Sequence, residues 1–181
     1  MSVEGYIGLP GSGKTYSMVH RAYYRRRKNP ALRVWANFHI SLPGGPVELL
    51  RKLPEDLRNV RDGLVLLDEL NIVMPGRLWN KVPAEMMYKF NQTRKSRLDL
   101  YYSAQVFDMV DKAAREVTNE TWEMSNWANL GFFWYRRYIL GNHKYPNGRG
   151  LIMFEDAVIR SYDTMEFIDV PEYAIGKPGD S

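Results

Sequence analysis

The sequence predicts an α/β fold in which helices cover both faces of a central, mostly parallel sheet. Short apolar runs typical of strands alternate with longer segments of helical character, which is the pattern of layered α/β proteins. The segment Gly63 to Leu67 is apolar without a break, as expected for a strand buried on both faces of a parallel sheet. A glycine-rich turn, Gly8 to Gly13, lies between the first expected strand and the first expected helix.

The N-terminal part of the chain predicts strands and helices in alternation. The helix from Lys14 to about Arg27 should end at the Asn29-Pro30 pair, because proline cannot continue the hydrogen-bond ladder and restricts the residue before it. The segment Pro43 to Pro46 is a loop by its glycine and proline content. The other expected elements are strands at Val3 to Gly8, Leu32 to Ala36 and Gly63 to Leu67, and a short helix at Val47 to Leu53.

The C-terminal part predicts two more helices and three more strands. Pro83 to about Ser96 should be helical, with proline near its start, and Val106 to about Glu123 should form a second helix, broken near Thr118. The strands are expected at Leu98 to Ala104, Phe132 to Ile139 and Leu151 to Phe154, with a turn at Tyr145 to Gly148. We expect residues 1–170 to form one domain and residues 171–181 a loose tail.

The composition is ordinary for a globular protein, with 181 residues, 45% hydrophobic and 25% charged. There are no cysteines, which excludes a disulfide scaffold and a thiolate metal site. The N-terminus shows no signal-peptide pattern, and the most apolar stretches fall short of the ~18 residues that a membrane-spanning helix needs. The sequence therefore predicts a cytoplasmic protein, unless a partner carries it to a membrane.

The net charge of +4 is unevenly distributed, because residues 1–60 hold ten Lys/Arg and four Asp/Glu, a net of +6. Much of this excess lies in the run Arg25 to Lys28. A basic patch of this kind can contact phosphate backbones. The favoured interpretation of the run alone is a solvated helix end, with cations near the negative pole of the helix.

The segment Gly8 to Thr15 matches the Walker A pattern of P-loop nucleotide-binding proteins, with glycines at both ends followed by Lys14 and Thr15. Glycine lets the backbone approach phosphates closely, and successive N–H groups and the helix N-terminus then face the anion. Lys14 would reach the β- and γ-phosphates of ATP, and the Thr15 hydroxyl would ligate Mg²⁺. The predicted nucleotide-binding residues are Gly8, Pro10, Gly11, Ser12, Gly13, Lys14, Thr15 and Tyr16.

An acidic pair, Asp68 and Glu69, follows the apolar strand that ends at Leu67 and resembles a Walker B motif. A carboxylate at a buried strand end can hold Mg²⁺, so Asp68 is the second predicted metal residue. Glu69 would activate the attacking water as a general base. Gln105 falls at the carboxyl end of another strand, the edge where open parallel sheets bind ligands, and would sense the γ-phosphate.

Arg94 and Arg97 lie between the helix after Pro83 and the strand that begins at Leu98, which places them at the opposite edge of the sheet. From there they would reach the nucleotide of a neighbouring subunit rather than their own, as arginine fingers acting in trans. A surface basic cluster is an equally weighted interpretation. Their assignment therefore depends on whether the chain forms an oligomer.

Six aromatic residues gather between positions 122 and 135 and allow two interpretations. Such side chains can stack on the bases of single-stranded nucleic acid. Aromatic residues also dominate cores and subunit interfaces, and we favour that role. The residues are Trp122, Trp127, Phe132, Phe133, Trp134 and Tyr135.

Taken together, Gly8 to Thr15, Leu67 to Glu69, Arg94 to Asp99 and Ser103 to Gln105 resemble the N-terminal ATPase domain of zonular occludens toxin-like proteins, which include filamentous-phage assembly ATPases. The resemblance covers roughly residues 3 to 140. This group is similar to the FtsK–HerA class of DNA-pumping motors, which includes viral packaging ATPases. It implies a RecA-like P-loop NTPase fold, a glutamine sensor at Gln105 and an arginine acting on the neighbouring subunit. The chain departs from the family pattern at Ala104, where threonine is usual, and in the Lys95 to Arg97 stretch, which lacks the usual His or Gly.

The resemblance implies an Mg²⁺-dependent ATPase that forms a homo-oligomeric ring and moves DNA, such as a viral genome, in the host cytoplasm or in association with a virion. One alternative is an ATPase for filamentous-virion assembly, whose membrane anchor lies on another chain. Another is a slow, nucleotide-gated interaction module that moves nothing. Capsid or membrane assembly proteins are possible partners in the first two cases.

Overall fold

The computed structural model describes residues 1–76, 82–139 and 145–163. Strands and helices alternate along most of the described chain, and no α-helix is found between the last three strands among the described residues. The elements in chain order are β1 (Val3–Ile7), α1 (Lys14–Lys28), β2 (Arg33–Ala36), β3 (Glu48–Leu49), η1 (Glu55–Leu57), β4 (Gly63–Leu67), α2 (Leu70–Val73), α3 (Ala84–Asn91), β5 (Leu98–Ala104), η3 (Phe107–Met109), α4 (Lys112–Glu116), β6 (Glu120–Trp127), η4 (Ala128–Leu130), β7 (Phe132–Ile139), β8 (Gly148–Met153) and α5 (Asp156–Ile159).

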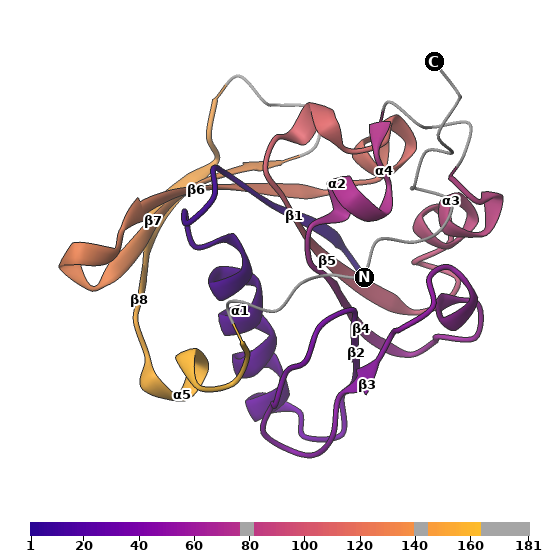
Figure 1. The fold of residues 1–181 in the computed structure, drawn as a ribbon, viewed down its shortest axis with the longest axis horizontal. Helices are drawn as coiled ribbons and strands as arrows, with labels where there is room; N and C mark the ends of the chain where they lie inside the picture. The colour runs from indigo at the N-terminus through magenta and orange to yellow at the C-terminus, as the bar shows by residue number, and fades with distance from the viewer. Residues whose placement is uncertain (77–81, 140–144, 164–181) are drawn as a thin grey trace, which may run out of the picture.

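The eight strands of the described residues form one sheet, in the order β3-β2-β4-β5-β1-β6-β7-β8. The first six in this order pair in parallel, and β7 pairs antiparallel with both β6 and β8. The predicted central, mostly parallel sheet is therefore confirmed. Because β1 lies between β5 and β6, the loop that follows it emerges in the middle of the carboxyl edge (Figure 1).

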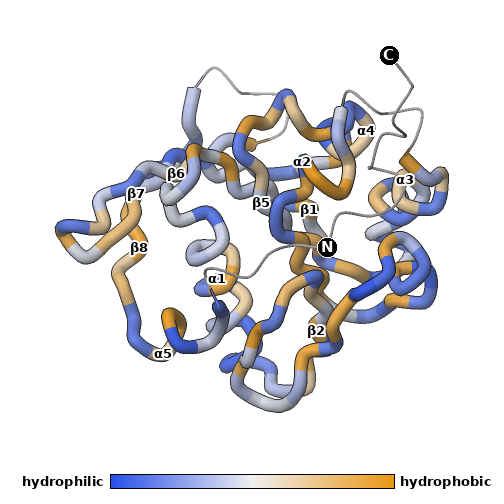
Figure 2. The backbone as a smooth tube through the Cα atoms, viewed as in Figure 1, coloured by the Kyte–Doolittle hydropathy of each residue, from blue (hydrophilic) through white to orange (hydrophobic). Residues whose placement is uncertain are grey.

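Helices cover both faces of the sheet, which confirms the three-layer architecture (Figure 1). Side chains of α1 and α5 pack on one face in a core that includes Tyr6, Met18 and Leu66. Side chains of α2, α3 and α4 pack on the other face in a core that includes Leu67 and Met86. The hydrophobic residues run through the central strands, and the outer loops are mostly hydrophilic (Figure 2).

The expected strands at Gly63–Leu67, Leu98–Ala104 and Phe132–Ile139 are confirmed at their exact bounds. The first strand, the first helix and β2 differ from prediction by a single residue at one end, and the final strand begins earlier, at Gly148. The helix predicted from Pro83 is shorter, since α3 ends at Asn91 and turns follow it.

The short helix predicted at Val47 to Leu53 is wrong. Glu48 and Leu49 instead form β3, which pairs in parallel with β2. The Leu50 N–H then donates to the carbonyl of Ala36 at 2.7 Å. The backbone N–H and C=O groups of this segment therefore bond to the edge of β2, whereas in a helix they would bond to one another.

The helix predicted from Val106 to Glu123 is correct only in part. Its helical portion is α4, in which the Asp111 side chain caps the helix by accepting from the Ala113 N–H at 2.9 Å. From Glu120 the chain is a strand, β6, which pairs with the otherwise free edge of β1. Side chains of Trp122 and Met124 then point into one core, so the segment follows the two-residue period of a strand.

No helix within the described residues is both long and apolar enough to cross a bilayer. The predicted loose tail, residues 171–181, lies outside the described residues, and so does the end of the predicted domain at residue 170. The single-domain assignment stays a prediction.

Candidate functional site

The glycine-rich loop joins β1 to α1 and depends on backbone angles that favour glycine. Gly11 and Gly13 have φ values of 74° and 87°, in the left-handed region that side chains disfavour. The Ser12 N–H donates to the Leu9 carbonyl at 3.1 Å, which closes the turn, and the Ser17 N–H donates to the Gly13 carbonyl at 2.9 Å, which starts α1. The sequence therefore forms a closed turn that leads directly into the positive end of a helix.

The ring of Phe133, on β7, packs against this loop. A Cβ atom on Gly13 would lie less than 3.0 Å from three atoms of that ring. A Cβ atom on Gly8 would likewise approach the Met124 carbonyl oxygen on β6 at 2.7 Å. Glycine is thus needed at both positions for close approach as well as for backbone angle, and Phe133 was not among the site residues predicted from sequence.

Lys14 is buried at the start of α1, and its ammonium donates to the Leu9 carbonyl at 3.1 Å. Burial lowers the pKa of Lys14, and the nearby carboxylates of Glu69 and Asp68 oppose this shift. The predicted lysine therefore lies within the electrostatic range of both predicted acidic residues. Because the buried ammonium has lost much of its water, it is stabilised by pairing with an anion inside the loop.

Thr15 and Asp68 meet at the carboxyl edge of the sheet although 53 residues separate them in sequence. The Thr15 hydroxyl donates to Asp68 Oδ1 at 2.9 Å, and the Ser103 hydroxyl donates to the same oxygen. Burial raises the pKa of Asp68, while these two hydrogen bonds and Lys14 oppose that shift. The two residues predicted to hold the metal are thus in direct contact.

Asn37, at the end of β2, holds the backbone of Asp68. Its side-chain amide donates to the Asp68 carbonyl at 3.0 Å, and its side-chain oxygen accepts from the Asp68 N–H at 2.7 Å. Sequence reasoning missed Asn37 and Ser103. The available signal was weak: each is a polar residue at or near the end of an apolar strand.

Glu69 has a φ of 49°, which is uncommon for a residue with a side chain. Its N–H donates to the Ser103 hydroxyl at 2.9 Å, so Ser103 contacts both members of the acidic pair. The Glu69 Oε2 atom is buried and has no hydrogen-bond partner among the described residues. A buried carboxylate oxygen without a donor is suited to accept a hydrogen bond from a water molecule.

Gln105 lies directly after β5, beside the start of the loop. The Gly8 N–H donates to the carbonyl of Ala104 at 3.3 Å, which places Gln105 next to the first residue of the loop. The Gln105 N–H points to the Asn71 side-chain oxygen at 3.4 Å, and its side chain is half-buried. The structure therefore brings Lys14, Thr15, Asp68, Glu69 and Gln105 to one edge of the sheet.

Arg94 and Arg97 lie at the opposite edge, as predicted. The Arg97 carbonyl accepts from the Gly63 N–H at the start of β4, and the Arg97 guanidinium pairs with Asp62. Arg94 is exposed in the turn before β5. Neither residue can contribute to the loop of its own chain, because the length of the sheet separates them.

Tyr16 was predicted as a nucleotide-binding residue, but its side chain points elsewhere. Its hydroxyl donates to the Met153 carbonyl at 2.9 Å and accepts from the Glu155 N–H at 2.8 Å. The ring packs against Phe133 and Phe154. Its part in nucleotide binding stays a prediction for the backbone N–H alone.

The basic run is the last turn of α1, as the favoured interpretation states, but it is not fully solvated. Arg26 is buried and donates to the Pro46 carbonyl at 3.1 Å, and Arg25 pairs with Asp99. Of the aromatic residues, Trp122 and Phe133 are buried in the core, as favoured. Trp127, at the end of β6, is instead 52% exposed.

The residues at this edge fit Mg²⁺ as a partner of a bound phosphate chain. Hydroxyl and carboxylate oxygens are the donors that Mg²⁺ takes, and Thr15 and Asp68 supply one of each. Within the described residues, no group of three or more His, Asp or Glu side chains is close enough to hold a metal ion. The metal would therefore need phosphate oxygens or water to complete its coordination.

Comparisons with known proteins support the fold. No protein-family model matches the sequence, and no curated protein matches it. Among solved structures, the N-terminal domain of zonular occludens toxin from Neisseria meningitidis is similar with a TM-score of 0.65 and 18% identity, over 90% of this chain and 98% of that one. B204, the DNA-packaging ATPase from Sulfolobus turreted icosahedral virus, is similar with a TM-score of 0.58 and 12% identity, over 83% and 96%. The genome-packaging NTPase B204 from Sulfolobus turreted icosahedral virus 2, in complex with ATP-gammaS, gives 0.57 and 12% identity over 83% and 96%.

Proposed function

We propose that this chain is an Mg²⁺-dependent ATPase that works in a homo-oligomeric ring and moves DNA during virus assembly. One observation carries the proposal. The Thr15 hydroxyl and the Asp68 carboxylate meet beside the buried ammonium of Lys14, at the mouth of a closed glycine-rich turn. A triphosphate in the turn would place its terminal phosphates between the cation and the metal ligands.

Each residue then has one role. Backbone N–H groups of the turn bind the phosphates, and Lys14 stabilises the negative charge that develops on the transferred phosphoryl group. Thr15 and Asp68 would hold Mg²⁺, which would supply positive charge to the phosphate oxygens. Glu69 accepts a proton from the attacking water through its unpartnered oxygen, and Gln105 contacts the γ-phosphate from the neighbouring strand.

We assign the trans-acting role to Arg94 rather than Arg97. Arg94 is exposed at the edge opposite the turn, so in a ring each subunit can place its Arg94 in the nucleotide site of the next subunit. Arg97 is less suitable, because its guanidinium pairs with Asp62. The nucleotide site of a single subunit is then incomplete, since every site needs an arginine from a neighbouring subunit.

DNA is the proposed cargo because the fold is similar to that of B204, whose reported function is DNA packaging. A genome-packaging role implies contact with capsid or membrane assembly proteins. In such a motor, hydrolysis changes the packing between subunits, and basic segments shift phosphate backbones.

The first experiment measures phosphate release with and without double-stranded and single-stranded DNA. Lys14→Ala should lose ATP binding. Glu69→Gln should bind ATP yet turn over at least about a hundredfold more slowly, the usual range for loss of a general base. Glu55→Gln, an exposed carboxylate changed in the same way, should match wild type. ATP binding that survives Lys14→Ala, or full turnover in Glu69→Gln, would contradict the site. ATPase activity that DNA does not stimulate would contradict the motor and favour the interaction module.

The second experiment tests the trans arginine by mixing inactive variants. Arg94→Ala and Lys14→Ala subunits are each expected to be inactive alone. In a mixed ring, a Lys14→Ala subunit supplies Arg94 to the intact turn of an Arg94→Ala neighbour, so part of the activity should return. Solution mass with an ATP analogue shows whether the ring forms. Activity of Arg94→Ala equal to wild type would show that Arg94 has no part in hydrolysis.

A further inference from the structure

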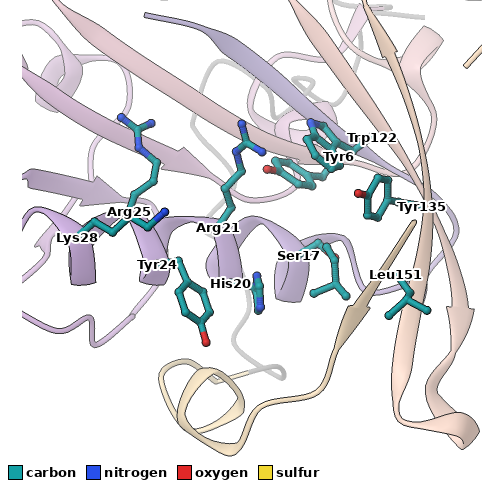
Figure 3. Close-up of a pocket in the computed structure, with 11 residues that line it drawn as sticks. Tyr6, Ser17, His20, Arg21, Tyr24, Arg25, Lys28, Trp122, Tyr135 and Leu151 are labelled. Atoms are coloured by element: carbon teal, nitrogen blue, oxygen red, sulfur yellow. The ribbon is translucent and has the colours of Figure 1, made fainter. Parts of the chain in front are cut away.

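The sheet divides the six aromatic residues between positions 122 and 135 into two sets, because successive side chains along a strand point to opposite faces. Three of them belong to the core under α1: Trp122, Phe133 and Tyr135. Figure 3 shows Trp122 and Tyr135 beside Arg21 of that helix, whose guanidinium stands 5.0 Å from the Trp122 ring. The other three point to the opposite face, and they are Trp127, Phe132 and Trp134.

That opposite face has no helix over β6, β7 and β8 among the described residues. The core under α2, α3 and α4 includes residues of β1, β2, β4 and β5, and no described residue of the last three strands belongs to it. Those strands extend away from the three helices (Figure 1). The register places Trp127, Phe132 and Met153 in one row across the strands, and Trp134 and Leu151 in the next row. We call this surface the open face.

The apolar side chains of the open face are accessible. Trp127 is 52% exposed, and Leu151 and Met153 are exposed to a similar extent. The Trp127 ring lies nearly parallel to that of Phe132, with an angle of 11° between the planes and 6.3 Å between the ring centres. A contiguous exposed apolar surface of this kind marks an interaction site.

A third row gives the open face its charge. It consists of Glu123, Arg136 and Arg149 on neighbouring strands. The Glu123 carboxylate pairs with Arg136 at 3.0 Å and accepts from the Tyr138 hydroxyl at 3.0 Å. Arg149 is exposed and has no ion-pair partner among the described residues. The row therefore carries one uncompensated positive charge, two residues along the strand from Trp134, or about 7 Å.

We propose that the open face binds single-stranded DNA, with bases stacked on Trp127 and Phe132 and a phosphate at Arg149. A single strand offers unpaired flat rings and phosphates together, which matches accessible rings beside a free guanidinium. Aromatic residues on antiparallel sheets stack two or three bases in the same way in RNA-binding modules. The inference deepens the proposed function and rests on it for the choice of DNA as the strand.

The first test measures fluorescence anisotropy of a labelled ten-residue oligothymidylate with the full-length protein, without ATP or Mg²⁺. Saturable binding is expected, and Trp127→Ala should weaken it about tenfold, within the range for loss of one base–aromatic stack. Tyr88→Ala removes a ring of α3 that is 61% exposed and should have no effect. Lys14→Ala should bind the oligomer as wild type does, because the glycine-rich turn takes no part.

The second test separates the phosphate contact from stacking by the salt dependence of binding. Arg149→Gln should lower the slope of log K against log salt by about 0.7, the value for one phosphate contact with a single strand. Trp127→Ala should leave this slope unchanged. Arg51→Gln makes the same change at an exposed arginine near β3, at the other edge of the sheet, and should match wild type.

The outcomes distinguish this site from the turn. ATP hydrolysis without DNA should be equal in Trp127→Ala and wild type, so loss of DNA binding alone supports the open face. Absence of ATP hydrolysis in wild type would contradict the turn and leave the binding result standing. Binding that is no weaker in Trp127→Ala than in Tyr88→Ala, or no saturable binding of the oligomer, would overturn the proposal. A solution mass without DNA that falls in Trp127→Ala would also overturn it, because the open face would then be a contact between subunits.

Discussion

Replacing Gly13 with alanine separates the two reasons for glycine in the turn. Gly13 has a φ of 87°, and its missing Cβ would overlap the Phe133 ring. Gly131, in the turn between β6 and β7, has a nearly identical φ of 81° and open space where a Cβ would stand. Gly131→Ala therefore carries only the backbone cost, and Gly13→Ala carries the same cost with the overlap in addition.

The expected magnitudes follow from these two environments. A non-glycine residue in the left-handed region costs about 1–2 kcal/mol, of which about 0.4–1 kcal/mol is recovered because alanine restricts the unfolded chain. This net cost of about 1 kcal/mol should appear in both variants. The overlap with Phe133 adds about 1–3 kcal/mol in Gly13→Ala, the usual cost of overfilling a packed site. For a chain of this size each 1 kcal/mol lowers the melting temperature by about 2–4 °C.

The assay is equilibrium urea unfolding of wild type and both variants, with the slope checked for constancy so that midpoints report stability. A double variant, Gly13→Ala with Phe133→Ala, completes the comparison, since removing the ring should remove the overlap term. The reasoning is refuted if Gly13→Ala is no less stable than Gly131→Ala, or if its excess cost persists when Phe133 is absent.

Three further predictions concern the acidic edge. Burial raises the pKa of Asp68, so its charged form opposes folding at neutral pH. Asp68→Asn should therefore raise the stability of the ligand-free protein at neutral pH, and the stability difference from wild type should disappear below the unfolded pKa of 3.8. Melting curves from pH 3 to 8 measure this difference. The same variant should lose Mg²⁺-dependent turnover, and retained turnover would count against the metal role. Ser103→Ala removes the hydroxyl shared by Asp68 and Glu69, so kcat should fall with little change in ATP affinity, while Ser103→Thr should keep activity. Equal kcat in wild type, Ser103→Ala and Ser103→Thr would exclude a positioning role for Ser103. Asn37→Ala removes two hydrogen bonds to the Asp68 backbone and should lower the free energy of unfolding in urea by about 1–3 kcal/mol. A decrease under about 0.5 kcal/mol would show that water replaces the side chain.

The parts of the fold that sequence predicted well are those in which local pattern and tertiary structure agree. The run Gly63 to Leu67 is apolar because both its faces are buried, and Phe132 to Ile139 is rich in β-favouring residues, so both strands were predicted at their exact bounds. The segment from Glu120 failed because its strand character comes from pairing with β1, more than a hundred residues earlier. The two-residue strand β3 failed for the same reason, since it exists only beside β2.

The candidate site shows a similar division. The proximity of Lys14, Thr15, Asp68 and Glu69 could be predicted because glycine spacing and an acidic pair after a buried strand are visible in the sequence itself. The supporting residues Asn37, Ser103 and Phe133 could not, because their roles follow from which strands become neighbours in the sheet. The place of Tyr16 after Thr15 gave no indication that its side chain packs against the end of β8, and its nucleotide-binding role stays a prediction.

The contacts of Tyr16 have a consequence for the order in which the chain matures on the ribosome. The helix behind the glycine-rich turn is secured by Met153 and by Glu155, which also bonds His20 and Tyr24. A nascent chain that has emerged only as far as β6 already holds the whole turn, yet lacks these late residues. In the proposed ATPase, nucleotide affinity should therefore arise only after residues 153 to 155 have emerged and packed on the helix.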